Sequence, residues 1–293
     1  MKKNNYTAAE AAELILKKMN ESDKILVGAG AGLSAAAGLS YMDQEAFKKH
    51  YPDMAKRGFH FAYELVGRGD DEWTTGRKWA YWATHINYVR NIFPQAKLYT
   101  TLLDILKDRD FFVVTSNADR QFMRAGFPEE RLFEFQGHYD NMGCSVRCTK
   151  KTWNNHEYLQ NILRNIDHET FECVPEALPR CPYCGELAEI CFRGDDYKVN
   201  QQRYIDFVEG SADKSICLIE LGVGFNTPGV IRWPFENITY HIDDAYLFRV
   251  NTSYKDYPYG RTAQTGYPSQ IEGKITSLEL DANDVINELH KLI

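Results

Sequence analysis

Ile25 to Leu39 reads Ile-Leu-Val-Gly-Ala-Gly-Ala-Gly-Leu-Ser-Ala-Ala-Ala-Gly-Leu, and this stretch decides the fold. Three apolar residues that favour β-structure lead into a glycine-rich turn, and an alanine-rich run with high helix propensity follows. The pattern predicts a buried strand, a tight turn and the start of a helix. Gly30, Gly32 and Ala35 match the G-x-G-x-x-G/A spacing at such a strand-to-helix junction.

The glycines of this turn favour a nucleotide-binding loop. Glycine allows positive φ and lets a ligand approach the backbone, because it has no Cβ atom. The N-terminus of the following helix offers N–H groups and a positive dipole end, which suit a pyrophosphate. An ordinary tight turn in an α/β core would use the same residues. No acidic ribose ligand is clear after a second strand, since Asp43 and Asp53 lie in stretches predicted to be helical, so the ordinary dehydrogenase pattern is absent.

Composition excludes several classes of protein. The chain has 293 residues, is 44% hydrophobic and carries a net charge of -7, which fits one large domain or a domain with an insertion. The acidic balance argues against broad nucleic-acid binding. No apolar run approaches the roughly 18 residues of a membrane span, and the basic N-terminus leads into no apolar segment, so neither a membrane span nor a signal peptide is expected.

Apolar strands are predicted to alternate with helices along the chain, a pattern typical of a parallel sheet covered on both faces. Residues 41–93 are rich in aromatic residues and contain no obvious strand, so we predict several short helices whose rings are mostly core. Residues 254–268 are loop-like. Further predicted strands are 111–115, 132–135, 215–221, 238–242 and 246–250, and predicted helices are 7–20, 76–91, 94–109, 157–166 and 281–292.

We therefore predict an α/β protein: a Rossmann-like parallel sheet with helices on both faces, plus a small inserted zinc-binding domain. Residues 1–140 and 193–293 would form the Rossmann-like domain, and residues 141–192 the insertion. The insertion holds six of the seven cysteines. The seventh, Cys217, lies inside a predicted apolar strand and is expected to be core.

Two close pairs of cysteines predict the zinc site. Cys144 and Cys148 form one pair, and Cys181 and Cys184 form the other. Four thiolates around a tetrahedral Zn²⁺ make a closed structural site without an open position for chemistry. Metal-ligand spacing, rather than disulfide pairing, points to a reducing cytoplasm. Chance clustering of buried cysteines is the alternative, and one ligand could be replaced by Cys173, Cys191, His138 or His156.

Polar residues follow several predicted strands. Thr115-Ser116-Asn117-Ala118-Asp119 follows the strand at 111–115, where an open α/β sheet has its ligand crevice. Asp119 could also cap the helix after it, and the two roles are compatible. Amides suit ribose hydroxyls and a carboxamide, although glycine and asparagine are favoured in any turn. Other strand ends deliver glycine or amide side chains at Gln136-Gly137-His138, Gly222-Val223-Gly224-Phe225-Asn226 and Asn251.

Taken together, these motifs resemble those of the sirtuin family. Gly30-Ala31-Gly32-Leu33-Ser34 with Gly38-Leu39 resembles the G-A-G-x-S…G-I loop, and Thr115 to Asp119 resembles T-Q-N-I-D. Gln136-Gly137 stands where the family has H-G, and the two cysteine pairs follow. Gly222-Val223-Gly224 stands at the G-T-S turn, and Asn251 at the late strand-end Asn. The resemblance implies a Rossmann-like NAD domain with a small zinc domain, and NAD as substrate rather than as hydride carrier.

Three departures from the sirtuin pattern bear on activity. Gln136 replaces the His that sirtuin deacylases use as general base, and an amide has no useful pKa for that work. His138 could stand in only if the chain stays extended through Gly137, since residues two apart share a face only in a strand. A phosphate-side Arg is missing because Ser40-Tyr41-Met42-Asp43 replaces P-D-F-R, and Val223-Gly224 lacks the hydroxyls of G-T-S.

The Gln-for-His pattern, with the C-x-x-x-C first pair, resembles the macrodomain-linked class M sirtuins of microbes. The resemblance implies a protein ADP-ribosyltransferase, a glycosyltransferase of an oxidative-stress response. It implies a lipoylated carrier related to the glycine-cleavage H protein as acceptor, and a macrodomain hydrolase as reversing partner. The implied catalytic residues are Asn117 and Gln136. The implied NAD-binding residues are Gly30, Ala31, Gly32, Ser34, Ala35, Tyr41, Ser116, Asn117, Asp119, Gln136, Gly222, Val223, Gly224, Asn226 and Asn251.

Three other functions stay open at this point. One is a weak NAD-dependent deacylase with His138 or water as base. Another is an NAD glycohydrolase that releases nicotinamide and modifies no protein. The third is a non-catalytic module that senses NAD. The absence of the family's His and Arg keeps this third function open.

Overall fold

The computed structural model describes residues 6–65, 73–252 and 267–293, and the chain folds into two compact units. The first unit comprises Met1–Gly38, Gln95–Gln136 and Asp196–Ile293. The second comprises Leu39–Pro94 and Gly137–Asp195. Each unit has its own secondary structure, and the two are described separately below.

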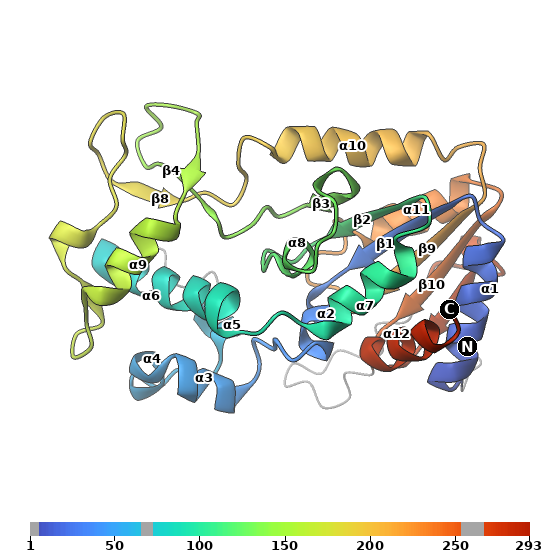
Figure 1. The fold of residues 1–293 in the computed structure, drawn as a ribbon, viewed down its shortest axis with the longest axis horizontal. Helices are drawn as coiled ribbons and strands as arrows, with labels where there is room; N and C mark the ends of the chain where they lie inside the picture. The colour runs from blue at the N-terminus through green and yellow to red at the C-terminus, as the bar shows by residue number, and fades with distance from the viewer. Residues whose placement is uncertain (1–5, 66–72, 253–266) are drawn as a thin grey trace. The chain divides into compact units, whose positions relative to one another are not determined.

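A parallel sheet forms the centre of the first unit (Figure 1). Its six strands are β1 (Lys24–Ala29), β2 (Phe111–Thr115), β3 (Leu132–Glu134), β9 (Ile216–Leu221), β10 (Ala245–Val250) and β11 (Ile275–Leu278). Their order across the sheet is β11-β10-β9-β1-β2-β3, so the glycine-rich stretch lies on a central strand. All neighbouring strands are parallel, which confirms the predicted α/β class and brings the carboxyl ends of the strands to one edge.

Helices cover both faces of this sheet, as predicted (Figure 1). Helices from the second half of the unit, α10 and α11, share an apolar cluster on one face, and α12 packs against both α1 and α7 on the other. Thr7 and Glu10 form a capping box at the start of the helix predicted at 7–20. The helices are α1 (Ala8–Asn20), α2 (Ala31–Ala36), α7 (Lys97–Leu106), α8 (Gln121–Arg124), α10 (Tyr197–Glu209), α11 (Arg232–His241) and α12 (Ala282–Lys291).

Gly28, inside β1, allows α11 to pack closely on the sheet. A Cβ atom at this position would lie 2.4 Å from Cγ2 of Ile231 and 2.8 Å from the ring of Phe235. Real Cβ atoms do not approach other atoms so closely, so any larger residue would push the helix away from the sheet. The first glycine of the stretch therefore serves packing, whereas the next two lie in the turn.

The second unit combines short helices with two small antiparallel sheets. It groups residues 39–94, which the sequence analysis assigned to the Rossmann-like domain, with the cysteine-rich segment. No strand forms among the described residues of 39–94, and α6 instead packs against α9 and β7 of the cysteine-rich segment. The elements are α3 (Gln44–His50), α4 (Pro52–Lys56), α5 (Ala62–Leu65), α6 (Thr75–Asn87), the π-helix η1 (Tyr88–Ile92), β4 (Asn141–Cys144), β5 (Trp153–Asn154), α9 (His156–Arg164), β6 (Ile166–Asp167), β7 (Glu172–Cys173) and β8 (Ala188–Ile190).

Two element predictions were wrong. The strand predicted at 238–242 is the end of α11, where Phe235, Ile238 and Ile242 are buried at helical spacing. The helix predicted from Pro94 begins only at Lys97, after Ala96 in an extended N-cap conformation. The sequence analysis did not predict β11, and residues 254–266 of the predicted loop lie outside the described residues.

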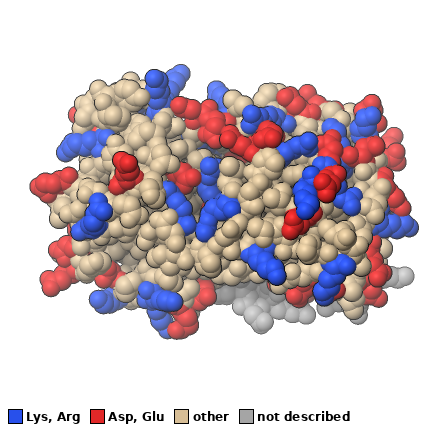
Figure 2. All heavy atoms as spheres, in the orientation of Figure 1, with Lys and Arg blue, Asp and Glu red and all other residues tan. Residues whose placement is uncertain are grey.

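The surface carries charges of both signs. Figure 2 shows Lys and Arg side chains interspersed with Asp and Glu on the face that it draws, without a continuous basic stripe there. None of the helices in the described ranges is both long enough and apolar enough to cross a membrane.

An aromatic cluster around His85, on α6, forms a core of the second unit. The imidazole is 0% exposed, and its Nδ1 lies 2.8 Å from the hydroxyl of Tyr51. The rings of Tyr41, Tyr81 and Tyr139 lie 5.2, 5.6 and 5.1 Å from the imidazole, measured between centroids. Burial lowers the pKa of His85 to about 3, so the ring is neutral at pH 7.

This buried histidine predicts acid sensitivity. Below its ordinary pKa of 6.5, His85 binds a proton in the unfolded chain but not in the native one until about pH 3. The free energy of unfolding should therefore fall by about 1.4 kcal/mol per pH unit from this group alone. Urea unfolding at pH 7, 6 and 5 should show about half of this loss between pH 7 and 6 and nearly all of it between pH 6 and 5 in the wild type, and this contribution should be missing in His85→Gln. His60→Gln, at an exposed position, should keep it; an unchanged slope in His85→Gln would contradict the assignment.

Candidate functional site

Two glycine turns interlock at the carboxyl edge of the parallel sheet. Gly30 and Gly32 follow β1, and Gly222 follows the neighbouring strand β9. The Gly30 N–H donates to the Leu221 carbonyl and the Gly32 N–H to the Gly222 carbonyl, each at 3.0 Å. A Cβ on Gly32 would lie 2.6 Å from the Gly222 Cα, and Gly222 has a φ of +62°. Only glycine allows this approach.

The turn after β1 leads into α2 as predicted, with Gly30 as the N-cap and Ala31 as the first helical residue. The Gly32 N–H is already paired with Gly222, and the Leu33 N–H donates to the Gly30 carbonyl at 3.0 Å. These two N–H groups are therefore not available to a ligand, and Gly30 and Gly32 serve the close contact between the two turns.

A buried hydrogen-bond network joins this turn to the end of β2. Asn117 donates from Nδ2 to the Gly30 carbonyl at 2.9 Å and to Ser34 Oγ at 3.0 Å. Ser34 donates to Asp119 Oδ2 at 2.6 Å, and its Oγ lies 2.9 Å from the Tyr99 hydroxyl. Ser34, Asn117 and Asp119 are all buried. These hydrogen bonds hold the side chains of two predicted site residues, Asn117 and Asp119, in fixed positions.

Burial controls the protonation chemistry of the network. It raises the pKa of the Asp119 carboxyl, while hydrogen bonds from Ser34 and from the Gln121 N–H lower it in part. Burial, followed by the Asp119 charge, holds the pKa of Tyr99 well above its usual value. Asp119 Oδ1 accepts from the Gln121 N–H, the first N–H of the short helix α8, at 3.0 Å, whereas the N-cap residue of α8 is Arg120. Because Ser34 and the Gln121 N–H hold the Asp119 oxygens in place, the network supplies donors and acceptors in fixed positions.

Other predicted positions line the same edge or follow its strands. Asn251 donates from Nδ2 to the Val223 carbonyl at 2.9 Å, which holds the turn after β9. Ser116 donates from its N–H to the Ala29 carbonyl at 3.1 Å. Gln136 follows β3 by two residues and is exposed. The exposed predicted positions also include Ala31, Ala35 and Asn226, and Gly224 is half-buried.

His138 and Tyr41 belong to the second unit. His138 Nδ1 lies 3.2 Å from the Asp140 N–H, and its Nε2 lies 3.4 Å from Asn141 Nδ2, so both ring nitrogens have local partners. Gly137 has a φ of +79°, which ends the extended conformation that a base role for His138 required. The Tyr41 hydroxyl lies 3.1 Å from the Tyr139 hydroxyl.

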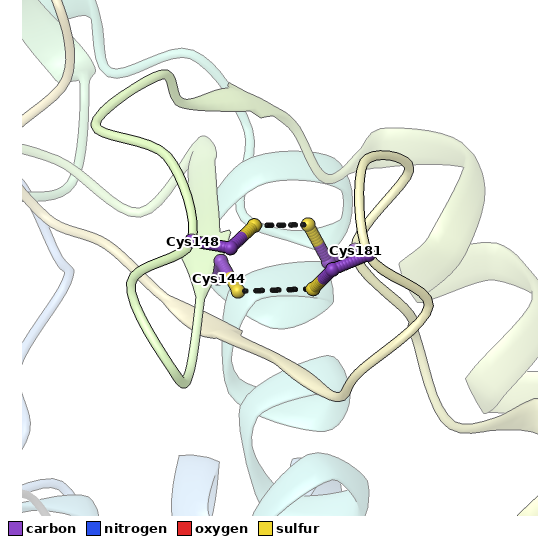
Figure 3. Close-up of side chains that lie close together, drawn as sticks. Cys144, Cys148 and Cys181 are labelled. Carbon is purple, nitrogen blue, oxygen red and sulfur yellow. Dashed lines mark hydrogen bonds between the residues drawn. The ribbon is translucent and has the colours of Figure 1, made fainter.

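The second unit brings the four predicted thiols together (Figure 3). The Sγ atoms of Cys144 and Cys184 are 3.6 Å apart, as are those of Cys148 and Cys181, and all four lie within 4.8 Å of one another. Tetrahedral Zn²⁺ with bonds of about 2.3 Å requires sulfur separations of about 3.8 Å, so the cluster fits a structural zinc ion.

The alternative zinc ligands lie outside this cluster. Cys173 Sγ donates to the Val174 carbonyl at 3.6 Å and Cys191 Sγ to the Arg193 carbonyl at 3.3 Å. Cys217, on β9, is fully buried among apolar residues as predicted, and burial raises its pKa to about 12.

Sequence reasoning missed two buried residues of the site. Tyr99 comes from α7 and reaches Ser34, 65 residues away in the sequence. Gln121 follows Asp119 by two residues and is 1% exposed. The signal that could have identified Gln121 in the sequence was a polar side chain in the first turn of a buried helix.

Comparison with known proteins identifies the fold. No family model matches the chain. It resembles a solved Sir2 homologue in complex with NAD, with a TM-score of 0.60 and 17% identity, over 96% of this chain and 93% of that one. A mutant Sir2 homologue in complex with ADP-ribose gives a TM-score of 0.58 and 18% identity, over 95% of each chain. The protein therefore has the sirtuin fold.

Two proteins of known name are similar to this chain in sequence. A probable bifunctional ADP-ribose hydrolase/ADP-ribosyltransferase of Fusarium oxysporum f. sp. cubense is 33% identical over 286 residues, 92% of this chain and 46% of that protein. A protein ADP-ribosyltransferase of Staphylococcus aureus is 26% identical over 250 residues, 82% of this chain and 78% of that protein. The chain thus spans about half the length of the Fusarium relative. It has the sirtuin fold and is similar in sequence to two proteins named as ADP-ribosyltransferases.

Proposed function

We propose that the protein transfers ADP-ribose from NAD to a side chain of a partner protein and releases nicotinamide. The observation that carries the proposal is the network of Asn117, Ser34 and Asp119 beside the interlocked glycine turns. It supplies a fixed polar surface at the edge of the sheet where α/β proteins bind nucleotides. The named activities of the two relatives support the same reaction.

NAD would lie along this edge with its pyrophosphate at the turn Gly30-Ala31-Gly32. Asp119, with the backbone at Ala118, would hold the nicotinamide carboxamide, and Asn117 would orient the adjoining ribose. The turn after β9 and its partner Asn251 would border the nucleotide from the next strand. The remaining NAD-binding positions implied by the sirtuin resemblance are part of this proposal.

The chemistry needs positioning more than a base. The bond between C1′ of the ribose and the nicotinamide nitrogen breaks, and its electron pair stays on nicotinamide. The acceptor forms a new bond to C1′ and releases its proton to water. Positive charge develops on the ribose, and fixed dipoles stabilise it. Gln136 can hydrogen-bond the ribose hydroxyls but cannot deprotonate them. This favours direct transfer over the deacylation that a His at this position supports.

The acceptor is proposed to be a lipoylated carrier similar to the glycine-cleavage H protein, with a macrodomain hydrolase that reverses the modification. The Fusarium relative carries both a hydrolase and a transferase activity in its name, which supports the link. The proposal also includes a role in oxidative stress and a location in the cytoplasm. The location follows because zinc-binding thiols persist in a reducing compartment.

Transfer to the carrier tests this function. Incubation with NAD and a lipoylated carrier should add one ADP-ribose to the carrier, read as intact mass, and omission of lipoate should prevent it. Nicotinamide release without an adduct would select a glycohydrolase, and O-acyl-ADP-ribose formed from an acyl-peptide would select a deacylase. Thermal stabilisation by NAD without turnover would select a sensing module.

Two variants test the assigned roles. Asn117→Ala should lower the rate of transfer about 100-fold, because fixed dipoles at the reacting centre are lost. Gln136→Ala should lower it roughly tenfold, the equivalent of one hydrogen bond. Gln202→Ala, an exposed amide on α10, is the control and should leave the rate unchanged. Wild-type rates in both site variants would overturn the assignments.

A further inference from the structure

Gln121 carries a buried amide that the protein itself does not satisfy. The residue is 1% exposed and is the first residue of α8. Within the described residues, neither Nε2 nor Oε1 of its side chain has a hydrogen-bond partner. Its backbone N–H lies 3.0 Å from Asp119 Oδ1, so the side chain leaves the main chain directly beside the Asp119 carboxylate.

Such a group is unfavourable unless a partner satisfies it. An amide removed from water without a compensating hydrogen bond destabilises the folded chain. Buried polar side chains in native proteins have a partner in the great majority of cases, and each exception calls for an explanation such as a functional role or a bound molecule. An apolar residue of similar size, such as methionine, would fill the same space without this penalty. Gln121 therefore points to a ligand with its own donor and acceptor.

The proposed substrate contains one group with the matching pattern. A primary carboxamide needs a donor for its oxygen and acceptors for its nitrogen. Asp119 offers only acceptors, and these already receive Ser34 at 2.6 Å and the Gln121 N–H at 3.0 Å. The side chain of Gln121 offers both kinds of atom, so two antiparallel hydrogen bonds can join it to a second primary amide. In NAD, that group is the carboxamide of nicotinamide.

We propose that the Gln121 side chain binds the carboxamide of the nicotinamide leaving group, next to Asp119. This inference rests on the proposed use of NAD. It assigns Gln121 a role in selecting nicotinamide over nicotinic acid, because a carboxylate has no N–H for Oε1 and would be repelled by Asp119. Gln121 binds only the leaving group, so it contributes nothing to the affinity for ADP-ribose.

Calorimetric titration of three ligands tests the proposal. Gln121→Met, which conserves shape, should weaken binding of NAD and nicotinamide at least tenfold and leave ADP-ribose binding within twofold of the wild type. Gln121→Leu should act in the same way, so the result does not depend on one variant folding. Gln202→Met is the matched control on the exposed face of α10. Neither Gln121 variant should lower the melting temperature without ligand, because an unpartnered amide has been removed.

Unchanged affinity for NAD and nicotinamide in both Gln121 variants would overturn the proposal in favour of an internal water partner. An equal loss for all three ligands would overturn it in favour of a structural role. These binding measurements do not require transfer. A failure of the transferase proposal can therefore be distinguished from a failure of the Gln121 proposal, because in the first case the wild type would bind the ligands without modifying a carrier. A wild type that binds none of the three ligands would overturn both.

Discussion

Cys181→Ser is expected to abolish zinc binding and to unfold the cysteine-rich part of the second unit. Cys181 lies 3.6 Å from Cys148 within the four-thiol cluster, and β4, β5 and β8 make only a small sheet around it. Structural zinc provides much of the folding free energy of small domains of this kind. We expect the loss of one ligand to lower the free energy of unfolding by about 4 kcal/mol or more.

Cys191→Ser is the matched control, since it removes a thiol of the same unit that lies outside the cluster and is partly exposed. Metal analysis should give one zinc per chain for the wild type and Cys191→Ser, and much less for Cys181→Ser. A chelator should lower the melting temperature of the first two proteins but not of the third. Full zinc content in Cys181→Ser would mean that the cluster is not the metal site.

Gly222→Ala should separate the two glycine turns and abolish NAD binding. The new Cβ would lie 2.2 Å from the Leu33 nitrogen and 2.3 Å from the Gly32 carbonyl carbon, and no side-chain rotation can move these backbone atoms. The φ of +62° adds strain of about 1 kcal/mol for alanine. Overpacking adds about 1–3 kcal/mol. We expect a combined loss of about 2–4 kcal/mol of stability, measured by urea unfolding.

Gly273→Ala separates strain from overpacking. Gly273 also has a positive φ, of +89°, but a Cβ there would meet nothing within 4 Å among the described residues. Gly273→Ala should therefore lower the stability only by the backbone strain at positive φ, about 1 kcal/mol. This variant should bind NAD as the wild type does. Equal losses in the two variants would show that the contact between the turns does not matter.

Local sequence patterns predicted an element correctly where the interactions that form it act within that element. The strand, turn and helix at Ile25 to Leu39 form as predicted, because the β-favouring run and the glycines act over a few residues. The same holds for the strand before Asn117 and for the helix predicted at 7–20. The run at 238–242 was ambiguous, since a short apolar stretch fits a strand or a buried helix end until its packing is known.

The sequence by itself determined the sheet strands that carry the site, the two cysteine pairs and the amide in place of a general base. Only the tertiary structure decided which distant groups meet. Ser34 reaches Asp119 across 85 residues, Tyr99 joins them from α7, and residues 39–94 pack with the cysteine-rich segment. Burial of Gln121 likewise emerged only from the fold. The physical reason is that hydrogen bonds and burial between distant segments depend on how helices pack on the sheet, which no local pattern encodes.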